Sequence, residues 1–116
     1  MADTTMYFNP RCSKCRTAEG LLQERGVDAE IVRYLDEPPT VADLRRLMQL
    51  LGIDDPRAMM RAGEDVYKEL KLVEADGDAL LDAITEHPIL LERPIVVRGD
   101  RAVIARPPER LLELLD

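Results

Sequence analysis

Apolar and polar positions at the start of the chain follow the spacing of a strand, a helix and a second strand. Residues 4–8 favour a strand and end at the turn signal Asn9-Pro10. Over residues 13–25 the apolar positions recur at helical spacing, and Gly26 suits the left-handed residue that ends such a helix. Residues 29–34 are again rich in β-forming side chains. The opening third therefore predicts a β-α-β unit whose two strands are parallel.

The middle of the chain is predicted to be a block of short helices. Pro38-Pro39 breaks the chain. Thr40 and Asp43 then have the spacing of a capping box at the start of a helix, which Gly52 closes. Further short helices are predicted at about 55–61, at 64–70 and at about 78–86.

The pattern changes again after Pro88. Two apolar runs, 95–97 and 102–105, flank a Gly-Asp turn and predict a β-hairpin. Pro107-Pro108 then begins a final helix. The expected buried stripe of that helix comprises Leu111, Leu112, Leu114 and Leu115.

The order of these elements predicts the fold class. At 116 residues the chain has the size of one domain. Its elements run β-α-β, then a helical insertion over about 40–87, then β-β-α. We therefore expect a single α/β domain over residues 1–116, with a mixed four-stranded sheet and a thioredoxin-like fold.

Charge and hydropathy narrow the possible partners. The sequence has 16 Lys and Arg against 23 Asp and Glu, a net charge of −7, which disfavours direct binding to nucleic acid. The acidity is concentrated in residues 36–92, with 6 basic and 14 acidic side chains. No apolar run approaches the roughly 18 residues that a membrane span requires, and the first residues do not resemble a signal peptide. We expect a cytoplasmic protein with no membrane association.

Two cysteines carry the candidate chemistry. With a single histidine they cannot complete a four-ligand structural zinc site, and we expect no metal. Cys12 and Cys15 form a C-x-x-C pair between the first strand and the first helix, which is typical of redox chemistry in the cytosol. The helix N-terminus and the nearby basic residues Arg11, Lys14 and Arg16 are expected to lower the pKa of Cys12, so that it reacts as a thiolate.

Two neighbours of Cys12 have expected roles of their own. Asn9 can hold the loop through hydrogen bonds from its side chain to the backbone. Cys15 lies one helical turn beyond Cys12, close enough to resolve an adduct on Cys12 by forming a disulfide. It also begins the apolar stripe of the helix, so it is equally a candidate for a small buried core residue. The sequence leaves both interpretations of Cys15 open.

Five segments in the same order resemble the glutaredoxin-linked arsenate reductase family. They are residues 9–16, Tyr34-Leu35-x-x-Pro38-Pro39, Leu51-Gly52 with Met60-Arg61, His87-Pro88, and residues 92–97. The resemblance implies a thioredoxin-like fold with a helical insertion. It also implies that Cys12 is the nucleophile that attacks arsenate, and that three arginines hold the oxyanion: Arg61, Arg93 and Arg106. We place Asn9 with them as a substrate-binding candidate.

The resemblance carries further expectations about the reaction. It implies a cis peptide at Arg93-Pro94. It implies no bound cofactor, glutathione as a co-substrate, and glutaredoxin or thioredoxin as the electron donor. Planar guanidinium groups suit a tetrahedral oxyanion because they offer paired donors and positive charge.

Two positions depart from the family pattern and keep other functions open. Phe8 stands where many of these reductases have a histidine, and Cys15 stands where they usually have another residue. A C-x-x-C at this place also resembles Spx-type regulators, which use the pair as a redox switch while binding RNA polymerase. The alternatives to an arsenate reductase are therefore a general dithiol-disulfide oxidoreductase and an Spx-type regulator.

Overall fold

A computed structural model describes residues 3–115 and divides them into two compact units. The first unit joins residues 3–37 to residues 93–115, and the second comprises residues 38–92. The helical insertion expected at about 40–87 thus lies within the second unit. Within residues 3–115 no helix has the length and apolar character needed to cross a membrane.

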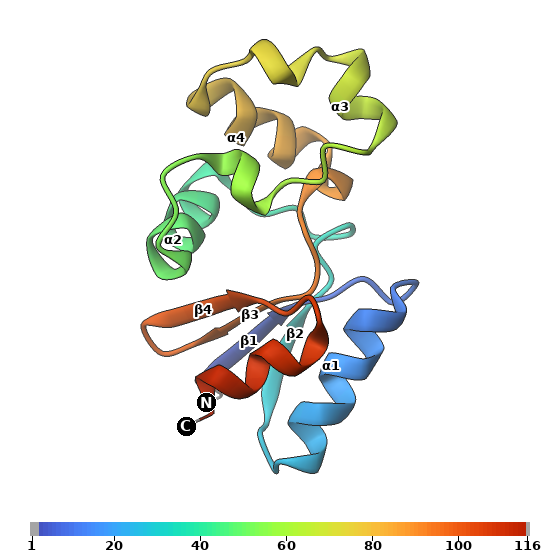
Figure 1. Ribbon diagram of the computed structural model, residues 1–116, viewed down its shortest axis with the longest axis vertical. Helices are drawn as coiled ribbons and strands as arrows, with labels where there is room; N and C mark the ends of the chain where they lie inside the picture. Colours follow the sequence, from blue (N-terminus) through green and yellow to red (C-terminus); the bar gives the residue numbers. More distant parts are fainter. Residues whose placement is uncertain (1–2, 116) are drawn as a thin grey trace. The chain divides into compact units, whose positions relative to one another are not determined.

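A mixed four-stranded sheet forms the first unit (Figure 1). Its strand order is β2-β1-β3-β4; β1 pairs in parallel with β2, while β3 is antiparallel to both β1 and β4. The strands are β1 (Thr4–Tyr7), β2 (Ala29–Val32), β3 (Ile95–Arg98) and β4 (Arg101–Ile104). This topology confirms the predicted β-α-β unit, the predicted hairpin and the thioredoxin-like arrangement of the sheet.

One face of this sheet is covered by α1 (Ser13–Glu24) and η4 (Pro108–Leu114) (Figure 1). Register places Met6, Val96 and Val103 in one row across β1, β3 and β4. The helices contribute the buried side chains Cys15, Ala18, Leu22, Leu111 and Leu114 to the same core cluster. Every core residue of α1 follows the apolar spacing of the sequence, which is why its position was predictable.

The final helix differs from the prediction, because η4 is a 3-10 helix and not an α-helix. In a 3-10 helix, residues three apart lie on the same face. Leu111 and Leu114 are accordingly buried, whereas Leu112 and Leu115 are half-buried. The predicted four-leucine stripe therefore narrows to two fully inserted side chains.

The second unit is helical. Thr40 and Asp43 form the predicted capping box, with hydrogen bonds of 3.1 and 3.0 Å, and Gly52 ends that helix with φ +71°. The buried side chains of the second unit include Leu44, Met59 and Ile84. The sequence does not predict the two short helices η2 (Leu72–Glu74) and η3 (Pro88–Leu90). The helices are α2 (Val41–Leu51), η1 (Pro56–Met59), α3 (Asp65–Glu69), η2 (Leu72–Glu74), α4 (Gly77–Glu86) and η3 (Pro88–Leu90).

Arg57 ties η1 to the segment around η2. Its Nη2 donates to the main-chain carbonyls of Leu72, Val73 and Ala75 at 2.8, 3.1 and 2.7 Å. Its Nε donates to the hydroxyl of Tyr67 at 3.2 Å. One side chain thereby donates to three carbonyls of this segment, of which that of Leu72 also accepts from the Ala75 N–H at 3.1 Å.

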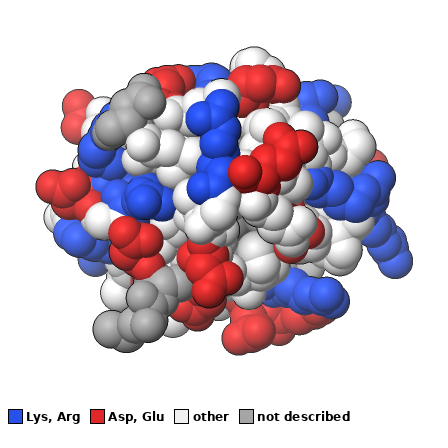
Figure 2. All heavy atoms as spheres, turned by 90° about the horizontal axis from the view of Figure 1, so that it is seen from below, with Lys and Arg blue, Asp and Glu red and all other residues white. Residues whose placement is uncertain are grey.

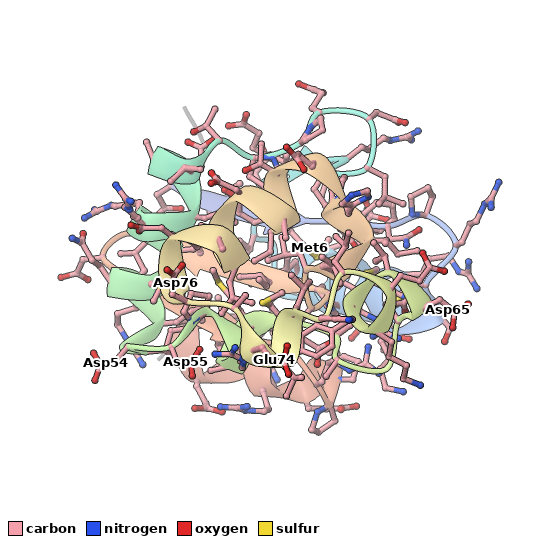
Figure 3. The ribbon with its side chains drawn as sticks, turned by 90° about the horizontal axis from the view of Figure 1, so that it is seen from above. Met6, Asp54, Asp55, Asp65, Glu74 and Asp76 are labelled. Carbon is pink, nitrogen blue, oxygen red and sulfur yellow. The ribbon has the colours of Figure 1, made fainter. Side chains whose placement is uncertain are left out.

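Charged side chains lie at the surface of both units. Basic and acidic side chains are interspersed over the face seen in Figure 2. In the second unit two acidic residues cap helices: Asp55 accepts from the Arg57 backbone N–H, and Asp76 from that of Ala79, both at 2.9 Å. Among residues 3–115, no three His, Cys, Asp or Glu side chains are grouped so that they could hold a metal ion. The exposed acidic residues labelled in Figure 3 are Asp54, Asp55, Asp65, Glu74 and Asp76.

Candidate active site

The loop between β1 and α1 holds Cys12 at the N-cap of α1. Asn9 closes this loop twice: its Oδ1 accepts from the Arg11 backbone N–H at 2.9 Å, and its main-chain carbonyl accepts from the Cys12 N–H at 3.0 Å. Asn9 is only 5% exposed. Its side chain therefore makes the loop-holding contact that the sequence led us to expect.

Cys12 is half-buried and its environment favours the thiolate. Burial raises the pKa of Cys12, but the backbone N–H and thiol of Cys15, the Arg93 side chain and the backbone N–H of Lys14 outweigh it and lower the pKa. The Cys12 side chain closes no capping hydrogen bond. These donors are nevertheless near enough to stabilise a negative charge on sulfur, as expected for a helix N-terminus.

The cation that contributes to this shift comes from a distant part of the sequence. We expected Arg11, Lys14 and Arg16 to supply it, but their side chains are exposed. Arg16 instead donates from Nη1 to the main-chain carbonyl of Pro10 at 2.9 Å. The arginine whose side chain is among the largest contributions to the pKa of Cys12 is Arg93, and it lowers that pKa.

Cys15 is a buried core residue, one of the two interpretations that the sequence left open, and its resolving role stays a prediction. It is fully buried in the core of the first unit, and it lies beside Cys12. Both cysteines are free thiols. Burial raises the pKa of Cys15 to about 12, so this thiol stays protonated at neutral pH and can donate its hydrogen toward the Cys12 sulfur.

Arg93 and Arg106 meet at the end of the β3–β4 hairpin. Arg106 Nη1 donates to the main-chain carbonyl of Arg93 at 2.9 Å, and the Ala105 N–H donates to the carbonyl of Pro94, also at 2.9 Å. The Arg93-Pro94 peptide is cis, as the resemblance implies, and so is Arg106-Pro107, which was not expected. The Nε and Nη1 atoms of Arg93 are buried without a hydrogen-bond partner among residues 3–115.

Tyr34 is a site residue to which the sequence gave no role. It lies two residues after the end of β2, is fully buried, and its hydroxyl forms no hydrogen bond within the described residues. Burial raises the pKa of Tyr34 to about 12, while Arg93 and Asn9 lie near enough to oppose this rise. In the sequence Tyr34 marked the end of an expected strand and the start of one segment of the family resemblance, and no spacing pattern pointed its hydroxyl toward the cysteine loop.

Arg61 belongs to the second unit. Its Nε donates to Glu64 and its Nη1 to Glu92, both at 3.1 Å. Burial disfavours the charge on Arg61, but these two carboxylates outweigh it and raise the pKa further. Its backbone N–H donates to the carbonyl of Leu90 at 2.7 Å. Of the predicted site residues, the structure therefore groups Asn9, Cys12, Cys15, Arg93 and Arg106 in the first unit and gives Arg61 a separate ion-pair setting.

The grouped residues define the chemistry that the first unit can perform. The lowered pKa of Cys12 increases the fraction of this thiol that is present as the nucleophilic thiolate. The Arg93 guanidinium beside it carries unpaired donors, which suit an anionic reaction partner. The buried second thiol supplies either a hydrogen-bond donor or a resolving group.

Comparisons with known proteins agree with this arrangement. A family model for the ArsC family matches residues 7–114. An arsenate reductase of Neisseria meningitidis is 48% identical over 99% of this chain and 100% of that protein. An arsenate reductase of Haemophilus influenzae is 46% identical over 95% of this chain and 97% of that protein. The solved structure of an arsenate reductase from Vibrio cholerae is 46% identical, covers 95% of each chain and gives a TM-score of 0.92.

The matched region includes both cysteines and all three candidate arginines, and the likeness extends through both units. Sequence, fold and the composition of the cysteine loop therefore lead to one conclusion: this chain belongs to the ArsC family.

Proposed function

We propose that this protein is an arsenate reductase-like thiol oxidoreductase in which the Cys12 thiolate attacks arsenate. The observation that carries the proposal is the lowered pKa of Cys12 next to an arginine whose buried donors are unpaired. The named arsenate reductases at 46–48% identity support the choice of substrate.

Arginine side chains make the attack on an anion electrostatically feasible. Arsenate carries negative charge at neutral pH and would repel a thiolate without compensation. Arg93 lies beside Cys12, and Arg106 is attached to the Arg93 main chain. In the proposal these two arginines bind the oxyanion and its thiol adduct, with planar donors matched to its oxygen atoms, and the family resemblance adds Arg61 as a third candidate. Asn9 supports the loop that presents the sulfur.

The proposed reaction has two steps, formation of a Cys12–arsenic adduct and release of arsenite from it. Cys12 sulfur bonds to As(V), and one arsenate oxygen leaves as water after protonation. A second thiol then attacks the Cys12 sulfur, and the electron pair of the S–As bond passes to arsenic, which leaves as arsenite, As(III). Two thiols are oxidised to one disulfide while arsenic gains two electrons, so a thiol donor must restore Cys12.

The second thiol is the open part of the mechanism. We propose glutathione as the co-substrate, with glutaredoxin or thioredoxin as the donor that regenerates the enzyme, and no bound cofactor. This assignment places the reaction in the cytoplasm, where glutathione is reduced. Cys15 is the intramolecular alternative, since its thiol lies beside Cys12.

A general dithiol-disulfide oxidoreductase is the second candidate function. The proximity of the Cys15 thiol to Cys12 favours it, because a pair of neighbouring thiols can reduce a disulfide and end as a disulfide itself. This function requires Cys15 in every turnover. The arsenate reductase that uses glutathione does not.

A coupled assay separates these possibilities. Purified protein is mixed with arsenate, reduced glutathione, glutaredoxin, glutathione reductase and NADPH, and a parallel series uses thioredoxin and its reductase. We expect arsenate-dependent NADPH oxidation that Cys12→Ser abolishes. Retained activity in Cys15→Ser identifies glutathione as the resolving thiol, whereas its loss identifies Cys15. A wild-type protein that consumes no NADPH in response to arsenate with either donor would refute the proposal.

A further inference from the structure

Tyr34 and Arg93 present an unusual pair of buried polar groups. The Tyr34 hydroxyl and two nitrogen atoms of Arg93, Nε and Nη1, are all buried, and none has a hydrogen-bond partner among residues 3–115. Buried polar groups are nearly always paired, and each unpaired one costs free energy. The three atoms belong to side chains that lie close enough to interact.

Donor and acceptor properties identify how these groups fit together. A guanidinium has donors only, whereas a tyrosine hydroxyl oxygen also accepts. The Tyr34 oxygen is thus an available acceptor for a buried N–H of Arg93. The same pairing is already closed elsewhere in the chain, where Arg57 Nε donates to the Tyr67 hydroxyl at 3.2 Å.

Arg93 connects this pair to the reactive sulfur. Its side chain interacts with Tyr34 and with Cys12. The hydroxyl also interacts with the side chain of Asn9, which holds the cysteine loop. Tyr34 is therefore in contact with both the loop that presents Cys12 and the guanidinium beside it.

We propose that Tyr34 is a positioning residue, whose hydroxyl accepts a hydrogen bond from the buried edge of Arg93 and holds that guanidinium against Cys12. Tyr34 does not itself touch the substrate in this role. It fixes the direction in which the remaining donors of Arg93 face the sulfur and any oxyanion bound there. The effect on Cys12 is independent of arsenate, while the effect on arsenate binding rests on the proposed function.

Tyr34→Phe removes the acceptor and keeps the ring that fills the core. Because Arg93 then loses its fixed orientation, the pH midpoint of Cys12 alkylation by iodoacetamide should rise by about half a unit. The unfolding midpoint should fall only slightly, because the phenyl ring keeps the core packed and a single hydrogen bond is lost. Tyr67→Phe is the matched control, since it removes a hydroxyl that accepts from Arg57 in the second unit, and it should leave the Cys12 midpoint unchanged.

A double-mutant cycle shows whether the effect passes through Arg93. In an Arg93→Ala background, Tyr34→Phe should produce no further change in the alkylation midpoint, because the group it positions is gone. Equal shifts in both backgrounds, or an unchanged midpoint in Tyr34→Phe, would overturn the proposal. Should Tyr34→Phe fail to fold, the 13Cζ resonance of Tyr34 is compared between wild type and Arg93→Ala. A shift confined to Tyr34 and absent from Tyr67 supports the pairing, and no shift overturns it.

The same variants keep this inference separate from the proposed function. If wild type does not reduce arsenate but the cycle shows coupling, the positioning role holds and the substrate assignment fails. If wild type reduces arsenate, Tyr34→Phe should raise the KM for arsenate about fivefold with a smaller change in kcat, as expected for a group that orients a binding residue.

Discussion

Arg106 donates a hydrogen bond from Nη1 to the main-chain carbonyl of Arg93 at 2.9 Å. Arg93 precedes β3 and Arg106 follows β4, so the contact lies at the open end of the β3–β4 hairpin. The hydrogen bond from the Ala105 N–H to the Pro94 carbonyl supports it. One nitrogen of Arg106 is thereby engaged with the backbone. In the proposed function its other nitrogen atoms bind the oxyanion, so that Arg106 serves both the hairpin and the candidate site.

Arg106→Lys should impair the site although it keeps the charge. A lysine has one compact ammonium group, which cannot hold the Arg93 carbonyl and present a planar pair of donors to an oxyanion at the same time. We expect the KM for arsenate to rise about tenfold, because an exchange of Arg for Lys is not conservative at such a site. Steady-state kinetics check this, with Arg110→Lys on the exposed face of η4 as the control. An unchanged KM would show that Arg106 contributes charge alone.

Cys12 should be the fast-reacting thiol of the protein. Because its pKa is lowered, the thiolate persists to a lower pH than in an ordinary cysteine, and reactivity is lost only as the pH falls through the lowered pKa. The pKa of Cys15 is about 12, so Cys15 stays unmodified near neutral pH. Alkylation by iodoacetamide as a function of pH, read by mass spectrometry of the intact protein, tests both statements. A midpoint at or above that of free cysteine would contradict this description of the loop.

The thiol of Cys15 should tune the pKa of Cys12. Cys15→Ala removes the S–H that faces the Cys12 sulfur, and the pKa of Cys12 should rise. Cys15→Ser retains a donor at the same place, so its pKa should lie between those of Cys15→Ala and wild type. The alkylation midpoints of the three proteins make the comparison. Identical midpoints in Cys15→Ala and wild type would show that the backbone N–H groups and Arg93 alone stabilise the thiolate.

Arg57 should contribute far more to stability than a surface arginine. Arg57→Ala leaves the partly buried carbonyl of Ala75 without its donor and removes one of two donors from that of Leu72, which should lower the free energy of unfolding by about 2 kcal/mol. Arg45→Ala is the control, since Arg45 pairs with Asp78 at the surface, where the two side chains are 59% and 84% exposed. Arg45→Ala should lower the free energy of unfolding by roughly 0.5 kcal/mol or less. Urea denaturation measures both values, and equal losses would contradict the role assigned to Arg57.

The sequence predicts the fold of the first unit well because its signals are local. Apolar alternation marks the strands, and a turn containing Gly99 in the left-handed region marks the hairpin. The difference at η4 arises because leucines three apart fit both an α-helix and a 3-10 helix, and only packing decides between them. The short helices η2 and η3 escaped prediction because they depend on Arg57 and on Pro88 in their folded surroundings.

Local sequence motifs predict only those contacts of the candidate site that are made within one short segment. Asn9 and Cys12 lie in one short loop, so their proximity follows from the sequence. The contact between Cys12 and Arg93 joins residues far apart in the chain, and the order of the strands creates it. The two ion-pair partners of Arg61 differ in the same respect, since one is near in the sequence and the other is distant. Glu64 lies three residues away, whereas Glu92 is brought near by the pairing of Met60 with Leu91.

The most direct test of the central claim is to measure the product itself. Wild-type protein and Cys12→Ser are incubated with arsenate, reduced glutathione, glutaredoxin, glutathione reductase and NADPH, and arsenite is quantified by chromatographic separation of arsenic species. We predict one arsenite per NADPH consumed by wild type and only background arsenite with Cys12→Ser. Arsenite formation at equal rates by the two proteins, or none above background by wild type, would contradict the claim that the Cys12 thiolate reduces arsenate.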